Sequence, residues 1–269
     1  MNIALCFSGQ VRAFRQTLPS LRKHILRPLK DDALFFFGHF PASPGSEAAF
    51  FLPFHDFIHE PTEPDLSNLL PQNPVGHDVE CRAWTTTHPL LGYLRQLRGI
   101  HQADQLRRAW SAHHGTRFDW VLRLRFDNLY MTSIEPLEQL QPDVLYVPAH
   151  DNWGGLNDRF AIAPPELMTI YANRFEEIGA YLQEGLFIHP ESLLAEHLAR
   201  HHMDARHTRV VHHLYRHGHL WKACFNPCEG DDPSFAPPQP GMRWRFQIKK
   251  RISEAAYQRL ALLWWKLGL

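Results

Sequence analysis

The stretch Arg117-Phe-Asp-Trp-Val-Leu-Arg-Leu-Arg-Phe-Asp-Asn-Leu-Tyr130 has the pattern of a buried β-strand that ends in charged side chains. An apolar run from Trp120 to Leu124 supplies the strand, and Arg125 and Asp127 follow it. In an open α/β sheet, ligands bind at the carboxyl ends of the strands. The stretch therefore predicts a ligand site at this strand end. A structural Arg–Asp pair that closes the strand is the alternative interpretation.

The alternation of side chains along this strand places Arg123, Arg125 and Asp127 on one face, opposite Leu122 and Leu124. Three charged side chains on one face are costly to bury without partners. That face must therefore line either a polar cleft or a structural ion-pair network, and we favour the cleft. A carboxylate there suits a divalent cation that carries phosphates, and an arginine can bind anionic oxygens.

The N-terminus has a second candidate anion site. An apolar strand at residues 3–7 leads into Ser8, Gly9 and Gln10, and Arg12 lies just beyond. A glycine turn before a helix exposes backbone N–H groups that favour an anion, and an arginine adds positive charge. This segment predicts a phosphate-binding turn.

Strand and helix patterns alternate along the chain, which predicts an α/β fold with a mostly parallel sheet sandwiched by helices. Prolines punctuate residues 41–82, which favours a wrapping loop there. We expect a single domain over residues 1–232. The expected strands cover residues 3–7, 33–37, 120–126, 144–147 and 159–163, and the expected helices cover residues 14–29, 88–113, 165–183 and 190–202.

Four segments, IALCFSGQVRAF, DWVLRLRFDNLY, GGLNDRFAI and HPESLLAEHL, resemble in their order and spacing a bacterial family of glycosyltransferases. That family is encoded with polysaccharide and lipopolysaccharide biosynthesis functions and is thought to have a GT-A-like, Rossmann-like fold. The resemblance covers roughly residues 1–215. At the end of this strand the family usually has the motif Arg-x-Arg-Pro-Asp. In this chain Phe126 stands in place of the proline. GT-A enzymes commonly carry Asp-x-Asp, whereas this chain has Arg125-Phe126-Asp127 and therefore one acidic ligand.

The resemblance implies transfer of a sugar from a nucleotide-sugar donor to a saccharide acceptor in surface-polysaccharide assembly (lipopolysaccharide, O-antigen or capsule). The leaving diphosphate needs a Mn²⁺ or Mg²⁺ ion, or arginines, to stabilise its charge. Asp127 is the expected metal ligand. The expected donor-binding residues are Ser8, Gly9, Gln10, Arg12, Arg123 and Arg125.

Inverting transfer also needs a general base beside the acceptor hydroxyl. Asp158 and Glu191 are the two candidates, and acidic positions in the acceptor part of GT-A-like enzymes favour Asp158. Each residue also has a structural explanation. Asp158 can close an Asx turn, and Glu191 can complement the dipole of a helix N-terminus.

Two other function classes remain open. The missing second aspartate favours a non-catalytic nucleotide- or sugar-binding protein with a degenerate GT-A site, whereas the joint presence of Arg12, Asp127, Asp158 and Glu191 favours the enzyme. A zinc hydrolase is a more distant hypothesis. It rests on the helical spacing of His197 and His201 in a chain with 19 histidines, which surface histidines explain better.

Composition narrows the remaining classes. The formal net charge of the 269 residues is zero, which argues against nucleic-acid binding. Four cysteines are too few for a disulfide scaffold. We find no secretory signal and no apolar stretch of about 20 residues, so we expect a cytoplasmic protein.

The C-terminal residues 233–269 differ from the rest, with a proline-rich linker over 233–240 and then a basic, Trp- and Leu-rich tail. A basic amphipathic helix suits the surface of an anionic membrane. The tail would then hold the enzyme on the inner face of the cytoplasmic membrane, near a lipid-linked saccharide acceptor. The alternative is a helix that packs on the domain or on a second subunit of a homodimer.

Overall fold

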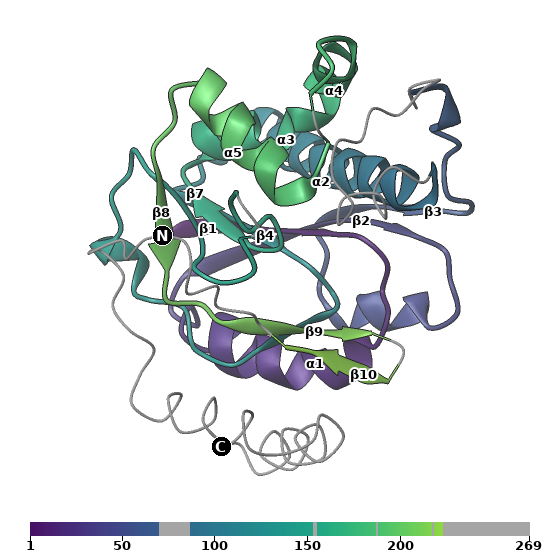
Figure 1. Ribbon diagram of the computed structural model, residues 1–269. Helices are drawn as coiled ribbons and strands as arrows, with labels where there is room; N and C mark the ends of the chain where they lie inside the picture. The colour runs from purple at the N-terminus through teal and green to yellow at the C-terminus, as the bar shows by residue number, and fades with distance from the viewer. Residues whose placement is uncertain (70–86, 153–154, 187, 217, 223–269) are drawn as a thin grey trace, which may run out of the picture.

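The computed structural model describes residues 1–69, 87–152, 155–186, 188–216 and 218–222 (Figure 1). The predicted linker and tail at 233–269 lie outside the described residues. In the part that is described, no helix is long and apolar enough to cross a membrane.

A seven-stranded, mostly parallel sheet forms the centre of the fold, and it contains the five predicted strands together with β3 and β8. Its strand order is β3-β2-β1-β4-β7-β6-β8, and every neighbouring pair is parallel except the two that β7 makes. The strands are β1 (Asn2–Ser8), β2 (Ala33–Pro41), β3 (Asp56–Glu60), β4 (Trp120–Leu124), β6 (Leu145–Pro148), β7 (Ala161–Ala163) and β8 (Ala205–Thr208).

Helices cover both faces of this sheet (Figure 1). Helix α1 (Phe14–Leu21), which continues into the π-helical turn η1 (Arg22–Leu26), lies on one face. The other face carries α2 (Thr87–His114), α3 (Pro165–Ala172), α4 (Arg174–Gln183) and α5 (Pro190–Arg200). The described residues also form the short 3₁₀ helices η2 (Ser46–Phe51), η3 (Ser67–Leu69) and η5 (Leu137–Gln139). The mostly parallel α/β sandwich is confirmed.

The predicted helix over 165–183 is wrong in one respect, because it is two helices that meet at Asn173. Arg174 is fully buried at this break and its Nε donates to the Tyr171 carbonyl at 2.9 Å. A buried guanidinium that bonds back to the preceding turn fixes the change of direction.

The predicted strand over 120–126 is also shorter than expected. β4 ends at Leu124, the chain turns, and β5 (Asn128–Tyr130) joins a second, antiparallel sheet with β9 (His212–Arg216) and β10 (His219–Trp221). Phe126 fixes this turn. Its ring lies 5.4 Å from Phe7 and 5.2 Å from Phe14, and its carbonyl accepts the Thr17 hydroxyl at 2.5 Å. The aromatic side chain of Phe126 thus anchors the turn in the core.

Candidate functional site

The main cavity lies at the point where the connections of the sheet change direction. From β1 the chain moves outward to β2 and β3, whereas β4 pairs with the other side of β1. Ligands of open α/β sheets bind outside the carboxyl ends of strands at such a switch point. A cavity of about 510 Å³ lies there, bordered by Gly9 and Gln10 after β1 and by Arg125 and Asp127 after β4. This volume falls within the usual range for small-molecule sites.

Charged side chains dominate the wall of this cavity. Six arginines face five carboxylates: Arg12, Arg95, Arg98, Arg125, Arg159 and Arg216, with Glu60, Glu63, Asp127, Asp158 and Glu191. Several of these charges pair with one another. Arg98 lies 2.5 Å from Glu60, and Arg95 lies 2.5 Å from Glu63.

Asp127 lies between two arginines. Nε and Nη2 of Arg125 donate to its two oxygens at 2.7 and 2.9 Å, and Nε of Arg216 donates to Oδ2 at 2.9 Å. Burial by itself would raise the pKa of Asp127, but the charges and hydrogen bonds of Arg125 and Arg216 outweigh it and hold the pKa well below its usual range. Asp127 is therefore a permanent carboxylate.

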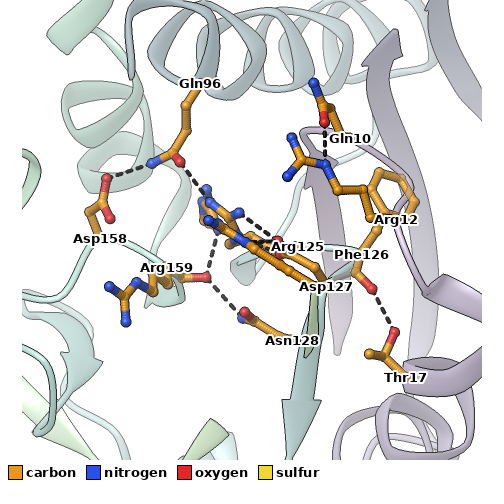
Figure 2. Close-up of polar contacts among 12 residues, drawn as sticks. Gln10, Arg12, Thr17, Gln96, Arg125, Phe126, Asp127, Asn128, Asp158 and Arg159 are labelled. Atoms are coloured by element: carbon orange, nitrogen blue, oxygen red, sulfur yellow. Dashed lines mark hydrogen bonds and ion pairs between the residues drawn. The ribbon is translucent and has the colours of Figure 1, made fainter. Parts of the chain in front are cut away.

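Gln96 of α2 joins the two sides of the cavity (Figure 2). Its amide oxygen accepts Nη1 of Arg125 at 2.6 Å, and its amide nitrogen donates to Oδ2 of Asp158 at 2.7 Å. Both ends of one amide are thus used, and the position of Arg125 is tied to that of Asp158.

Asp158 and Glu191 form the opposite wall, and both are buried, with 2% and 3% of their surface exposed. The Glu191 carboxylate lies 3.7 Å from Nη2 of Arg159 and 3.3 Å from Nδ1 of His189. Burial and then the charge of Asp158 raise the pKa of Glu191 to about 8. The structure therefore brings the two predicted acids together, and Glu191 is the one whose pKa is raised toward the neutral range.

A close backbone contact sets this pairing. The Leu156 N–H donates to the Glu191 carbonyl at 3.0 Å, so the loop that carries Asp158 packs on the first turn of α5. A Cβ at Gly155 would lie 2.1 Å from the Glu191 carbonyl oxygen. Only glycine permits this approach.

The predicted phosphate turn differs from expectation at Gly9. Its N–H donates to the His39 carbonyl at 3.2 Å, and α1 starts only at Phe14, after Ala13 with φ 51°. The turn therefore does not direct the Gly9 N–H at a ligand, and this part of the prediction is wrong. Its side chains do contribute, since Gln10 and Arg12 line the cavity and Nε of Arg12 donates to the Gln10 amide oxygen.

Ser8 and Arg123 lie away from the cavity. Both are buried and line a separate space of about 10 Å³ beneath α2 and α3. Nη1 of Arg123 donates to the Arg159 carbonyl at 2.6 Å, and Asn128 donates to the same oxygen at 3.1 Å (Figure 2). Arg123 thus supports the loop that carries Arg159 from below.

The sequence interpretation missed Gln96, Arg159 and Arg216. It also missed two ion pairs in the cavity wall, Arg98–Glu60 and Arg95–Glu63. Arg216 is the informative case. It ends β9, and the segment His212-His-Leu-Tyr-Arg216 is compatible with a strand, but the sequence does not show which strand it pairs with. Gln96 gave no signal, because an amide within a helix is usually exposed.

Side chains that could hold a metal ion gather at one other place in the described residues. Among these residues, groups of three or more potential ligands occur only as Glu177, His197 and His201, on α4 and α5, and none of these lines the cavity. Their contacts do not require an ion, because the Tyr181 hydroxyl lies 2.5 Å from Glu177 and 2.7 Å from His197. The residues around Asp127 do not fit a divalent cation well, since two guanidinium groups already occupy its carboxylate.

Comparison with known proteins gives a family and no activity. Residues 1–211 match the model of a domain of unknown function, DUF7796. The matched region includes most of the cavity wall and ends before Leu214, Arg216 and Trp221. No curated protein matches the chain. Because the match spans most of the sequence, this chain belongs to the DUF7796 family.

Proposed function

We propose that this protein is a glycosyltransferase of GT-A-like fold that moves a sugar from a nucleotide-sugar donor to a saccharide acceptor in surface-polysaccharide assembly. The observation that carries the proposal is the cavity at the switch point of the sheet, which has fixed arginines on one wall and a buried acid with a pKa of about 8 on the other. The fixed arginines can stabilise the charge of a leaving diphosphate, and the buried acid can take part in a proton transfer.

In this proposal the donor diphosphate binds against Arg125 and Arg216, and Arg12 lies at the edge of the cavity that β1 forms. As the bond between the anomeric carbon and the diphosphate oxygen breaks, negative charge grows on the diphosphate. Guanidinium groups that are already oriented stabilise that charge without reorganising. Asp127 holds both guanidinium groups in place through its three hydrogen bonds.

Glu191 is the better base candidate of the two acids. In an inverting reaction the oxygen of the acceptor hydroxyl attacks the anomeric carbon. A carboxylate must accept the proton of that hydroxyl at the same time. A base with a pKa near the working pH performs this transfer well, and Glu191 has a pKa of about 8. Asp158 is instead bonded to Gln96 and lies near the buried cations Arg123 and Arg174. We therefore assign Asp158 a positioning role, which reverses the order expected from the sequence.

A binding panel tests the proposal. The full-length chain is titrated with uridine, guanosine, cytidine, thymidine and adenosine diphosphates by calorimetry, with Mn²⁺ and with EDTA. We expect one diphosphate to bind and its nucleotide-sugar to be hydrolysed slowly to the diphosphate and free sugar. Arg125→Lys should weaken binding, because lysine keeps the charge and loses the two-pronged geometry. The matched control is Arg22→Lys, at an exposed position outside the cavity.

The second candidate function is a nucleotide- or sugar-binding protein without catalysis. The observation that favours it is the enclosure of Asp127, the one acidic residue where GT-A enzymes commonly carry two, by arginines. Binding of a nucleotide-sugar with no hydrolysis and no transfer to any saccharide acceptor would support it.

The C-terminal tail completes the proposal. Basic residues of 242–251 and the tryptophans Trp264 and Trp265 would place the enzyme on the cytoplasmic membrane, at a lipid-linked acceptor. Truncation after Gly241 should abolish sedimentation with anionic liposomes and leave nucleotide binding intact. If the full-length chain ignores such liposomes at low salt, the tail is better explained by packing on the domain or in a homodimer.

A further inference from the structure

The charge balance around Asp127 favours an anionic ligand. Asp127 pairs with two arginines, Arg125 and Arg216, which leaves one net positive charge in this largely buried cluster. The side chains of Arg125 and Asp127 are only 10% and 5% exposed, and that of Arg216 is 33% exposed toward the cavity, so water screens the charge less well than at an open surface. The pKa of Arg216 is lowered, first by burial and then by the charge of Arg125. An anion between the two arginines would relieve that repulsion.

The unused donors point the same way. Arginine carries five N–H donors. Arg125 gives three of them to Asp127 and Gln96, and Arg216 gives one to Asp127. Within the described part of the chain, the terminal nitrogens of Arg216 donate no hydrogen bond, and both residues line the cavity. Forked guanidinium groups with spare N–H donors match the oxygens of a phosphate.

The same surroundings that favour an anion are unfavourable for a metal cation at Asp127. Its ligand would be a carboxylate whose oxygens already accept three guanidinium hydrogen bonds, and it would lie beside two like charges. In the described residues, no cluster of three metal-ligating side chains forms at the cavity wall.

We infer that Arg125 and Arg216, held by Asp127, bind the donor diphosphate in place of a divalent cation, so that binding and transfer do not depend on metal. This inference rests on the proposed function, because it concerns the leaving group of that reaction. It assigns Arg216, from β9 of the second sheet, to the donor site, and it makes Asp127 a positioning residue.

The test is the nucleoside diphosphate selected by the panel above, titrated into the full-length protein with Mn²⁺ and with excess EDTA. We expect equal affinity in both buffers. Arg216→Gln should weaken binding about tenfold to a hundredfold in either buffer, the usual effect of one lost charged hydrogen bond. Arg216→Lys should recover only part of the loss, and Arg22→Gln should lose nothing. Circular dichroism and thermal unfolding check that each variant folds.

Three results would count against the inference or the proposed function, and each has a different consequence. Binding with Mn²⁺ that disappears in EDTA overturns the inference and leaves the proposed transferase intact. Metal-independent binding that Arg216→Gln does not change removes the arginine pair as its cause. The absence of binding by every diphosphate in both buffers overturns the proposed function as well. Inorganic diphosphate alone, as a further probe, should compete with the nucleotide if the arginines contact its phosphates.

Discussion

The two walls of the cavity put carboxylates to opposite uses. On the wall formed by β4 and β9, Asp127 is surrounded by Arg125 and Arg216, and its pKa lies well below the usual range. On the wall formed by the loop before β7 and by α5, burial raises the pKa of Glu191 to about 8. Asp127 can only stay charged and hold its arginines, whereas Glu191 can exchange a proton near neutral pH. Environment assigns the roles of two similar groups.

The largest effect is expected from Glu191→Gln, which removes the proposed general base. Turnover with the donor and acceptor should fall by about 10² or more, and diphosphate affinity should stay near that of the wild type. In the wild type, kcat/KM should rise with pH toward about 8, because only the carboxylate form of Glu191 accepts a proton. This rising limb should be absent in the residual activity of Glu191→Gln.

Asp158→Asn is the companion variant. If Asp158 positions its neighbours, a rising pH limb persists at reduced turnover and moves to lower pH, because the charge of Asp158 contributes to the raised pKa of Glu191. Should Asp158→Asn lose the limb and Glu191→Gln keep it, the roles of the two acids are the reverse of those proposed here.

The raised pKa of Glu191 also predicts a dependence of stability on pH. The folded protein holds this proton up to about pH 8, whereas the unfolded chain releases it near the ordinary value of 4.5. The stabilisation is complete below pH 4.5 and is lost as pH rises toward 8. Relative to the wild type, Glu191→Gln should therefore gain a few kcal/mol of unfolding free energy over this range, at about 1.4 kcal/mol per pKa unit.

Urea unfolding of both proteins at several pH values measures this difference. Buried histidines such as His150 and His212, whose pKa values are lowered, act in the opposite direction but are present in both proteins. Parallel stability curves for the two proteins would contradict the raised pKa.

Gly155→Ala tests how the second wall is assembled. A methyl group 2.1 Å from the Glu191 carbonyl oxygen would push the loop away from α5, at about 1 to 3 kcal/mol for an overpacked site. Gly179→Ala is the matched control. Gly179 lies inside α4, a Cβ added there meets nothing within 4 Å, and alanine should stabilise the helix by about 0.5 to 1 kcal/mol. Equal stabilities of the two variants would mean that the contact between loop and helix is not tight.

The sequence predicted the central sheet because continuous apolar runs, typical of buried strands, alternate with segments whose apolar residues recur at helical spacing. It also predicted that Asp127, Asp158 and Glu191 belong to one site, from strand ends and a helix start. It could not predict that Arg216 reaches Asp127, since that contact spans 89 residues of chain and needs β9 to pair with β5. Nor could it separate Arg123 from Arg125. Alternation puts both on one face, and only the packing of α2 and α3 decides which one is covered.

The smallest effect is expected from breaking the link between the two walls. Gln96→Leu keeps the size of the side chain and removes its hydrogen bonds to Arg125 and Asp158. Diphosphate affinity should fall about tenfold, since Arg125 loses one of the contacts that orient it. Gln105→Leu, at an exposed position of the same helix, is the control. A double-mutant cycle with Arg125→Lys should give a coupling energy of about 0.5 to 3 kcal/mol. Strict additivity of the two changes would mean that the walls act independently, and the amide would then be a packing element only.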